Sequence, residues 1–157
     1  MPREAVAALT EAPLVDLDSF APYLMNRVIA RGNGALSIAL RQHKLTFQHW
    51  RVLLVLVNRG RRTINTLAED TGVPQSTLSR LLTRMEKASL VRRLGHREDS
   101  RVVEVEVTDT GQRAFAGILP LADQVWTDMV RALAPAEQAQ LRQFLQRMLF
   151  AGKGVSA

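Results

Sequence analysis

Residues 63–87 read TINTLAEDTGVPQSTLSRLLTRMEK, and this stretch is the most informative about the fold. Thr63 suits an N-cap, because its hydroxyl can accept a hydrogen bond from an unpaired amide in the first turn of a helix. Gly72 supplies the left-handed backbone conformation that ends this helix, and Pro74 stands where a second helix can begin. The stretch therefore predicts two short helices joined at a glycine, which is a helix-turn-helix.

The second of these helices is predicted to be amphipathic. Its apolar residues fall at positions i, i+3, i+4 and i+7 and form one stripe, Leu78, Leu81, Leu82 and Met85. The remaining face starts with short hydrogen-bonding side chains and becomes basic toward its end. Arg80 is long enough to bond both O6 and N7 of a guanine, so this face suits the major groove of DNA. A core helix with a solvated polar face is the alternative interpretation.

A β-hairpin is predicted directly after the two helices. Residues 90–94 have strand character, and residues 102–107 alternate as Val-Val-Glu-Val-Glu-Val. A two-stranded hairpin is marginal in water and must pack against the helices. The combination predicts a winged helix-turn-helix, so the expected fold class is mainly α with a small β-hairpin wing.

The tip of this hairpin, residues 95–101, is polar and basic. Arg97 is expected to enter a minor groove, where a narrow A·T tract concentrates negative potential. Asp99 is expected to organise the turn and to orient Arg101 through a charge-assisted hydrogen bond. A solvated hairpin that contacts nothing is the alternative interpretation.

The sequence resembles the MarR family of bacterial transcription regulators over residues 45–111. The motifs that carry the resemblance are LT (45–46), QHWRVL (48–53), TLA (66–68), STLSR (76–80), LVRR (90–93), DSR (99–101) and TDTG (108–111). Such proteins are homodimers that bind pseudo-palindromic DNA through two winged helices, and a small, often aromatic, acid releases many of them. One departure is Ser89, which stands where the family usually has glycine and predicts a strained or differently shaped turn.

The resemblance implies a sequence-specific regulator of transcription that binds double-stranded DNA as a homodimer, with repression as the expected action. It maps the DNA-binding residues onto Pro74, Gln75, Ser76, Thr77, Ser79, Arg80 and Arg84 of the recognition helix, and onto Arg97, Asp99 and Arg101 of the wing. The alternatives are a sequence-independent architectural DNA binder and a family member that binds a protein partner instead.

Helices are expected on both sides of the winged helix. The whole chain, residues 1–157, is expected to form one domain, with a winged-helix core over about 46–108 and dimerisation helices over about 16–45 and 109–150. The Gly32-Asn33-Gly34 sequence predicts a kink or break in the first helix, and Pro120 predicts a kink in the helix after the wing. The terminal helices carry more apolar surface than one small module needs, and pairing with an identical chain would bury it.

An effector pocket is expected between the terminal helices and the winged helix, with a small aromatic acid as its ligand. The candidate residues are Tyr23, Arg27, His43, His49, Trp50 and Arg51. For three of these residues another interpretation is preferred, with Trp50 in the core and His43 and His49 at the surface, and no pocket.

The charge distribution agrees with a nucleic-acid surface. The chain has 21 Lys and Arg against 15 Asp and Glu, a formal charge of +6. Residues 59–101 carry ten basic and five acidic side chains, or +5, whereas the flanking segments are nearly neutral. A basic middle of this kind is the footprint expected of a nucleic-acid surface. An arginine-rich composition alone could produce it, and surfaces that bind membranes or acidic proteins look similar.

Several other classes of protein are excluded or disfavoured. The chain has no cysteine, which excludes disulfides, thiolate zinc sites and cysteine nucleophiles. His43, His49 and His96 are scattered, and no nucleophile elbow or phosphate-cradling loop is present. Glu104 and Glu106 share a strand face and are expected to form a solvated edge of the wing. We therefore expect no enzyme, no catalytic residue, no metal and no cofactor.

The expected location is the cytoplasm, with no membrane partner. The longest uninterrupted apolar run, Val52–Val57, is far shorter than the ~20 residues of a membrane-spanning helix. The first dozen residues have no charged segment followed by a continuous apolar core, so no signal peptide is expected.

Overall fold

The computed structural model describes residues 15–95 and 102–151 of the 157-residue chain. The predicted wing-tip residues Arg97, Asp99 and Arg101 lie outside the described residues. The chain divides into two compact units, with the boundary between Arg31 and Gly32. The predicted winged-helix core, about 46–108, falls inside the second unit.

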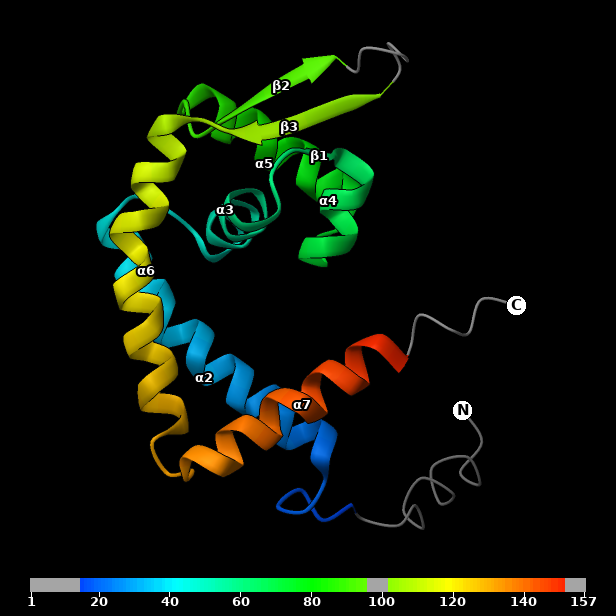
Figure 1. Ribbon diagram of the computed structural model, residues 1–157, viewed down its shortest axis with the longest axis vertical. Coiled ribbons are helices and arrows are strands. Elements are labelled where there is room, and N and C mark those ends of the chain that lie inside the picture. Colours follow the sequence, from blue (N-terminus) through cyan, green and yellow to red (C-terminus); the bar gives the residue numbers. More distant parts are fainter. Residues whose placement is uncertain (1–14, 96–101, 152–157) are drawn as a thin grey trace, which may run out of the picture. The chain divides into compact units, whose positions relative to one another are not determined.

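Nine elements follow one another along the described chain (Figure 1). They are α2 (Ala21–Gln42), α3 (Phe47–Arg59), β1 (Arg62–Thr63), α4 (Ile64–Thr71), α5 (Gln75–Lys87), β2 (Val91–Gly95), β3 (Val103–Val107), α6 (Asp109–Val130) and α7 (Pro135–Ala151). The three strands form one antiparallel sheet, and helices α3, α4 and α5 lie on one side of it (Figure 1). The predicted fold class, mainly α with a small β wing, is confirmed.

Local capping chemistry fixes the helix-turn-helix as the sequence predicts. The Thr63 hydroxyl accepts a hydrogen bond from the amide of Thr66 at 3.2 Å and starts α4. Gly72 has φ 62° and ψ 23°, the left-handed conformation that ends α4. Pro74 then occupies the N-cap position of α5. The two helices and the turn are therefore specified by residues close to them in sequence.

The sheet has one strand more than the predicted hairpin. Its order is β1-β3-β2, and β2 pairs with β3 in a register that places Val91 opposite Val107 and Gly95 opposite Val103. Strand β1 pairs with the other edge of β3, with Arg62 opposite Val105. A two-residue strand has no periodicity that a sequence could reveal. It ties the start of α4 to the wing.

Helix α2 is unbroken, which corrects the expected break at the Gly32-Asn33-Gly34 sequence. Gly32 is buried, and a Cβ at this position would overlap the side chain of Met129 on α6. The glycine therefore permits close approach of α6 and does not interrupt the helix. Helix α6 is also continuous, with Pro120 inside it.

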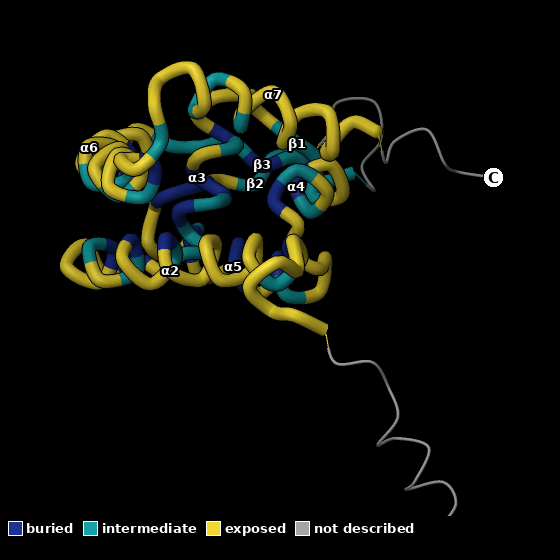
Figure 2. Tube along the Cα trace, turned by 90° about the horizontal axis from the view of Figure 1, so that it is seen from below, coloured by how far each residue is buried: buried dark blue, intermediate teal, exposed yellow. Residues whose placement is uncertain are grey.

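The hydrophobic core of the second unit surrounds α3. Leu53, Leu78 and Val105 are fully buried there, which joins α3, α5 and the sheet. Trp50 stacks on Phe115 of α6, with ring centroids 4.9 Å apart and planes 9° from parallel. Figure 2 shows the buried path of α3 and the exposed course of α7, which has no buried residue.

Two further features concern only residues 15–95 and 102–151. No helix in these ranges is long and apolar enough to cross a membrane. No group of three or more His, Cys, Asp or Glu side chains there is arranged to hold a metal ion.

Candidate nucleic-acid interface

Helix α5 separates an apolar face from a polar one. Its stripe of Leu78, Leu81, Leu82 and Met85 is at most 1% exposed. The core therefore holds the helix in one rotational setting about its axis. The opposite face remains at the surface and includes the exposed residues Gln75, Ser76, Arg80, Thr83 and Arg84.

The predicted recognition residues occupy consecutive turns of this surface. Thr77, Arg80, Thr83 and Arg84 line a shallow hollow of about 520 Å³. The Arg80 Nε donates to the carbonyl oxygen of Ser76 at 3.4 Å, which aligns the arginine along the helix. The structure thus brings Ser76, Thr77, Arg80 and Arg84 together, while Ser79 is partly covered.

The arginines of the basic middle segment divide into two groups. Asp70 pairs with Arg59 and Arg62, and Glu86 pairs with Arg93. By contrast, the cations of α5, namely Arg80, Arg84 and Lys87, form no ion pair with the other described residues. Among the described residues of this middle segment, the cations left without an acidic partner and available to a phosphate backbone therefore lie on α5.

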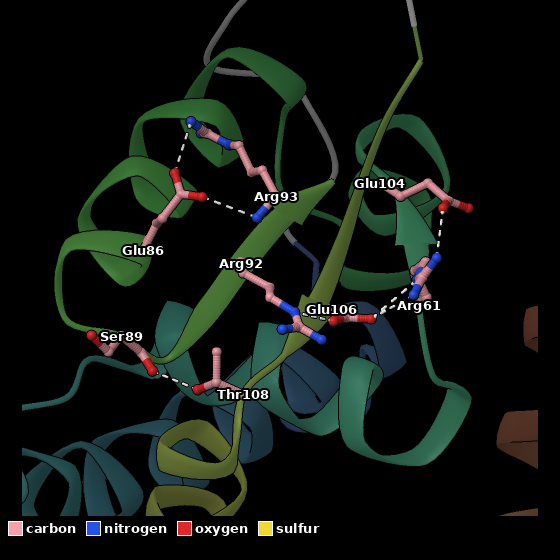
Figure 3. Close-up of polar contacts among 8 residues, drawn as sticks. All are labelled: Arg61, Glu86, Ser89, Arg92, Arg93, Glu104, Glu106 and Thr108. Atoms are coloured by element: carbon pink, nitrogen blue, oxygen red, sulfur yellow. Dashed lines mark hydrogen bonds and ion pairs between the residues drawn. The ribbon is translucent and has the colours of Figure 1, made fainter. Parts of the chain in front are cut away.

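The other face of the sheet carries a row of ion pairs. Glu106 lies between Arg92, its cross-strand partner, and Arg61, whose Nη2 is 2.8 Å from Glu106 Oε2 (Figure 3). Arg61 also reaches Glu104 at 3.3 Å. Hydrogen bonds from Arg92 and then Arg61 lower the pKa of Glu106. The expected solvated edge at Glu104 and Glu106 is wrong, because β3 is the central strand and its carboxylates pair with Arg61, directly before β1, and in the case of Glu106 also with Arg92 of β2.

Arg93 connects the wing to the recognition helix, a role that sequence reasoning missed. Its Nη2 donates to the Ser79 carbonyl oxygen at 2.9 Å and to the Thr83 hydroxyl at 3.0 Å. Its backbone amide donates to Glu86 Oε1 at 3.0 Å (Figure 3). Strand β2 is thereby fixed to α5 at Ser79, Thr83 and Glu86. The partners lie on different elements, so the periodicity of one element does not indicate these bonds.

The turn between α5 and β2 has the geometry that the departure at Ser89 suggests. Ser89 has φ 56°, which lies in the left-handed region that favours glycine. Its carbonyl oxygen accepts a hydrogen bond from the hydroxyl of Thr108, the N-cap residue of α6 (Figure 3). The turn therefore carries local strain, and a contact at the base of the wing holds it.

The candidate effector residues of α3 contact different neighbours. The imidazole of His49 accepts a hydrogen bond from the Thr46 amide at 2.9 Å and completes a capping box. Trp50 is 6% exposed and stacks in the core. The Arg51 guanidinium lies 5.9 Å from the centroid of the Phe47 ring and close to Gly72. Three successive side chains thus reach the cap, the core and the helix-turn-helix turn.

The remaining candidate effector residues lie on or just after α2. In the first unit, Arg27 Nη1 donates to the Tyr23 hydroxyl at 2.9 Å. In the second unit, His43 is exposed, and its Cε1 lies 3.9 Å from the position of a Cβ at Gly117 on α6. The predicted pocket as a whole stays a prediction.

The chain is similar in sequence and in structure to known transcriptional regulators. Residues 43–102 match the model of the MarR family. The chain is 31% identical to a solved MarR-family transcriptional regulator from Silicibacter pomeroyi, with a TM-score of 0.79 over 88% of this chain and 94% of that one. It is 28% identical to the regulator FarR of Neisseria gonorrhoeae over 109 residues, which are 69% of this chain and 75% of FarR.

One of the solved structures that share this fold is a complex with DNA. The chain matches a mutant MarR of Escherichia coli bound to operator DNA with a TM-score of 0.77 and 22% identity, over 88% of this chain and 99% of that one. At this identity the match shows the fold alone. The match at 31% identity to the Silicibacter pomeroyi regulator, together with the family model over the winged helix, shows more than a shared fold. The chain belongs to the MarR family of DNA-binding transcriptional regulators.

Proposed function

We propose that this regulator binds a pseudo-palindromic operator as a homodimer and represses transcription, with α5 in the major groove and the wing beside it. The observation that carries the proposal is the division of α5, whose apolar stripe is buried while its polar and cationic face stays exposed. A recognition helix requires this division, because its backbone must be fixed while its side chains reach the DNA.

The side chains of α5 have complementary roles in this proposal. Gln75, Ser76 and Thr77 lie in the first turn and contact base edges at close range. Arg80, one turn later, bonds the O6 and N7 atoms of a guanine, a contact that discriminates by roughly 1–3 kcal/mol against other bases. Arg84 lies one turn further along the same face and contacts a phosphate.

The wing supplies a second group of contacts. Gly95 at the end of β2 is paired with Val103 at the start of β3, and the tip residues lie between them in the sequence. Arg97 at this tip contacts the minor groove and Arg101 contacts the backbone, with Asp99 orienting Arg101. This part of the proposal rests on the sequence and on the hairpin from which the tip extends.

Dimer formation is supported by the apolar surface of the terminal helices. The exposed large apolar side chains of α6 and α7 are Leu119, Trp126, Phe144, Leu145, Met148, Leu149 and Phe150. An exposed apolar surface of this kind is costly in water, and pairing about a two-fold axis would bury it against a second copy of the chain. Two copies would also place two recognition helices about 34–36 Å apart, in successive major grooves.

Repression and release by an effector complete the proposal. The similar proteins include the repressor IacR of Pseudomonas putida and the homoprotocatechuate degradative operon repressor of Escherichia coli. In BpsR of Bordetella bronchiseptica, which has this fold, 6-hydroxynicotinic acid regulates DNA binding. A small aromatic acid that binds the DNA-free dimer more tightly than the DNA-bound dimer would release this protein from its operator.

A competition titration tests this function. The purified protein is titrated with DNA from upstream of its own gene and with a scrambled duplex of the same composition. We expect tighter binding to the upstream DNA, and an affinity whose logarithm falls with log salt at a slope near −7 if ~8 phosphates are neutralised. Equal affinity for both duplexes would favour an architectural DNA binder. Absence of binding at low salt would favour a protein partner.

A further inference from the structure

A direct hydrogen bond links the first turns of the two helices of the helix-turn-helix. The Nε2 of Gln75, the first residue of α5, donates to Oδ1 of Asn65 in the first turn of α4 at 2.7 Å. Both residues are exposed. They also line a hollow of about 290 Å³ between the helices and the wing strand, together with Thr63, Ile64, Val102 and Val103.

In this hydrogen bond the amide nitrogen of Gln75 faces the amide oxygen of Asn65. A glutamine amide has two N–H donors and one carbonyl acceptor. Asn65 takes one donor, so the second N–H and the carbonyl oxygen remain for another partner. Adenine offers a matching pair in the major groove, with N7 as acceptor and the N6 amino group as donor. Gln75 thus keeps the groups that adenine needs, in one orientation.

The backbone of Asn65 is held in place by its neighbours in α4. It lies two residues after Thr63, which caps α4 and pairs with Glu104 of β3. Leu67, in the same helix, is fully buried. The Gln75 side chain itself has rotatable bonds that would otherwise be ordered only when DNA binds, at a cost to affinity.

We propose that Asn65 is a positioning residue for sequence recognition, which orients the Gln75 amide to read adenine at one position of each half-site. The inference rests on the proposed function, because it needs a protein that discriminates between base sequences. Asn65 is outside the set of recognition residues that the sequence predicts, and it acts through Gln75.

The test is selection from a library of duplexes with a randomised centre. The wild type, Asn65→Ala, Gln75→Ala and the double variant are each used. Asn58→Ala serves as a matched control, because the Asn58 side chain donates to the Leu54 carbonyl oxygen of its own helix, α3. We expect Asn65→Ala to weaken one adenine preference in each half-site about three- to tenfold. The same position should respond to Gln75→Ala, and the double variant should lose no more than Gln75→Ala alone.

The outcomes separate the inference from the proposed function. A wild type that enriches no motif would overturn the proposed function. A wild type that enriches a motif which Asn65→Ala enriches unchanged would overturn the inference. Asn65→Asp gives an independent check, because it keeps the acceptor oxygen. Its added charge weakens binding to all sequences, but the adenine preference should survive, and its loss in this variant would also contradict the inference.

Discussion

Single residues in strained or capping positions shape the surroundings of α5. Ser89 adopts φ 56° in the turn that leads from α5 to β2. His49 accepts a hydrogen bond that starts α3, while its ring lies near the charge of Arg84. The sequence identifies Ser89 as a departure from the family, but it does not show that His49 completes the capping box of α3.

Ser89→Gly is expected to stabilise the protein. Glycine adopts a positive φ without the clash that a Cβ creates, so the free energy of unfolding should rise by about 1 kcal/mol. The bond to Thr108 uses the backbone carbonyl of residue 89 and is kept. Denaturant unfolding measures the change. Ala88→Gly is the control, because Ala88 has φ −85° and should give no gain; an equal response of both variants would contradict the strain at Ser89.

His49→Gln is expected to change the pH dependence of stability. Burial, and secondly the charge of Arg84, lower the pKa of His49 from 6.5. The unfolded chain therefore binds more protons as the pH falls from about 6.5 toward the lowered pKa, and the wild type loses stability in that window. Glutamine can serve at this position of a capping box without titrating.

The measurement for this variant is denaturant unfolding at about pH 7.5 and at about pH 5.5. The loss of unfolding free energy between the two should be smaller for His49→Gln than for the wild type. The same loss in both proteins would show that His49 does not titrate within the cap.

For helices and strands, the sequence predicts features that depend on neighbouring residues, but not features that depend on contacts between distant segments. Helix α4 begins after Thr63 and α5 after Pro74, as the sequence predicts. Thr63 acts through a capping bond to a residue three positions away, whereas Pro74 makes no side-chain cap bond and acts through its restricted backbone. The burial of one face of α5 follows from its periodicity. Which face of α5 is exposed could therefore be predicted from the sequence alone.

Contacts between distant segments were beyond sequence reasoning. Strand β1 exists because Arg62 and Thr63 meet β3, some forty residues later. Helix α2 continues through Gly32 because Met129 fills the space beside it. The pairing of Arg61 and Arg92 with Glu106 likewise depends on the folded sheet. Because several arginines of residues 59–101 pair with carboxylates, fewer cations are available to DNA than the net charge of this segment indicates.

Gly111→Ala is expected to disrupt the junction between α6 and the sheet. A Cβ at Gly111 would overlap the Leu90 carbonyl oxygen and lie 2.7 Å from Val107 Cγ2. Both neighbours belong to the packed base of the wing, so the free energy of unfolding should fall by about 1–3 kcal/mol or more. Thermal unfolding followed by circular dichroism measures this loss.

Gly117→Ala, in the same helix, is the control for this prediction. The nearest atom to its added Cβ is His43 Cε1 at 3.9 Å, which is an ordinary contact. Alanine has the higher helix propensity, so this variant should gain up to about 1 kcal/mol. A loss equal to that of Gly111→Ala would mean that glycine is needed in α6 for another reason.

At the scale of the whole molecule, the proposal requires two chains. Helix α7 has no buried residue, and Met148 and Leu149 are 59% and 67% exposed. Met148→Glu should separate a dimer, because its charge would be buried without a partner. Light scattering should give twice the chain mass of 17.5 kDa for the wild type and a single chain mass for the variant.

Gln143→Glu provides the matched control on α7. Gln143 is exposed, and the substitution adds the same charge to the same helix. It should leave the dimer intact. A wild type of single chain mass, or a Met148→Glu variant that remains dimeric, would contradict a dimer built on this apolar surface.

Protection of single cysteines from alkylation tests whether the exposed face of α5 contacts DNA. The chain has no cysteine, so Ser76→Cys on α5 and Gln124→Cys on α6 each carry the only thiol. We predict that bound DNA strongly slows thiol alkylation of Ser76→Cys and leaves Gln124→Cys unchanged. Alkylation of Ser76→Cys at the same rate with and without bound DNA would contradict the account.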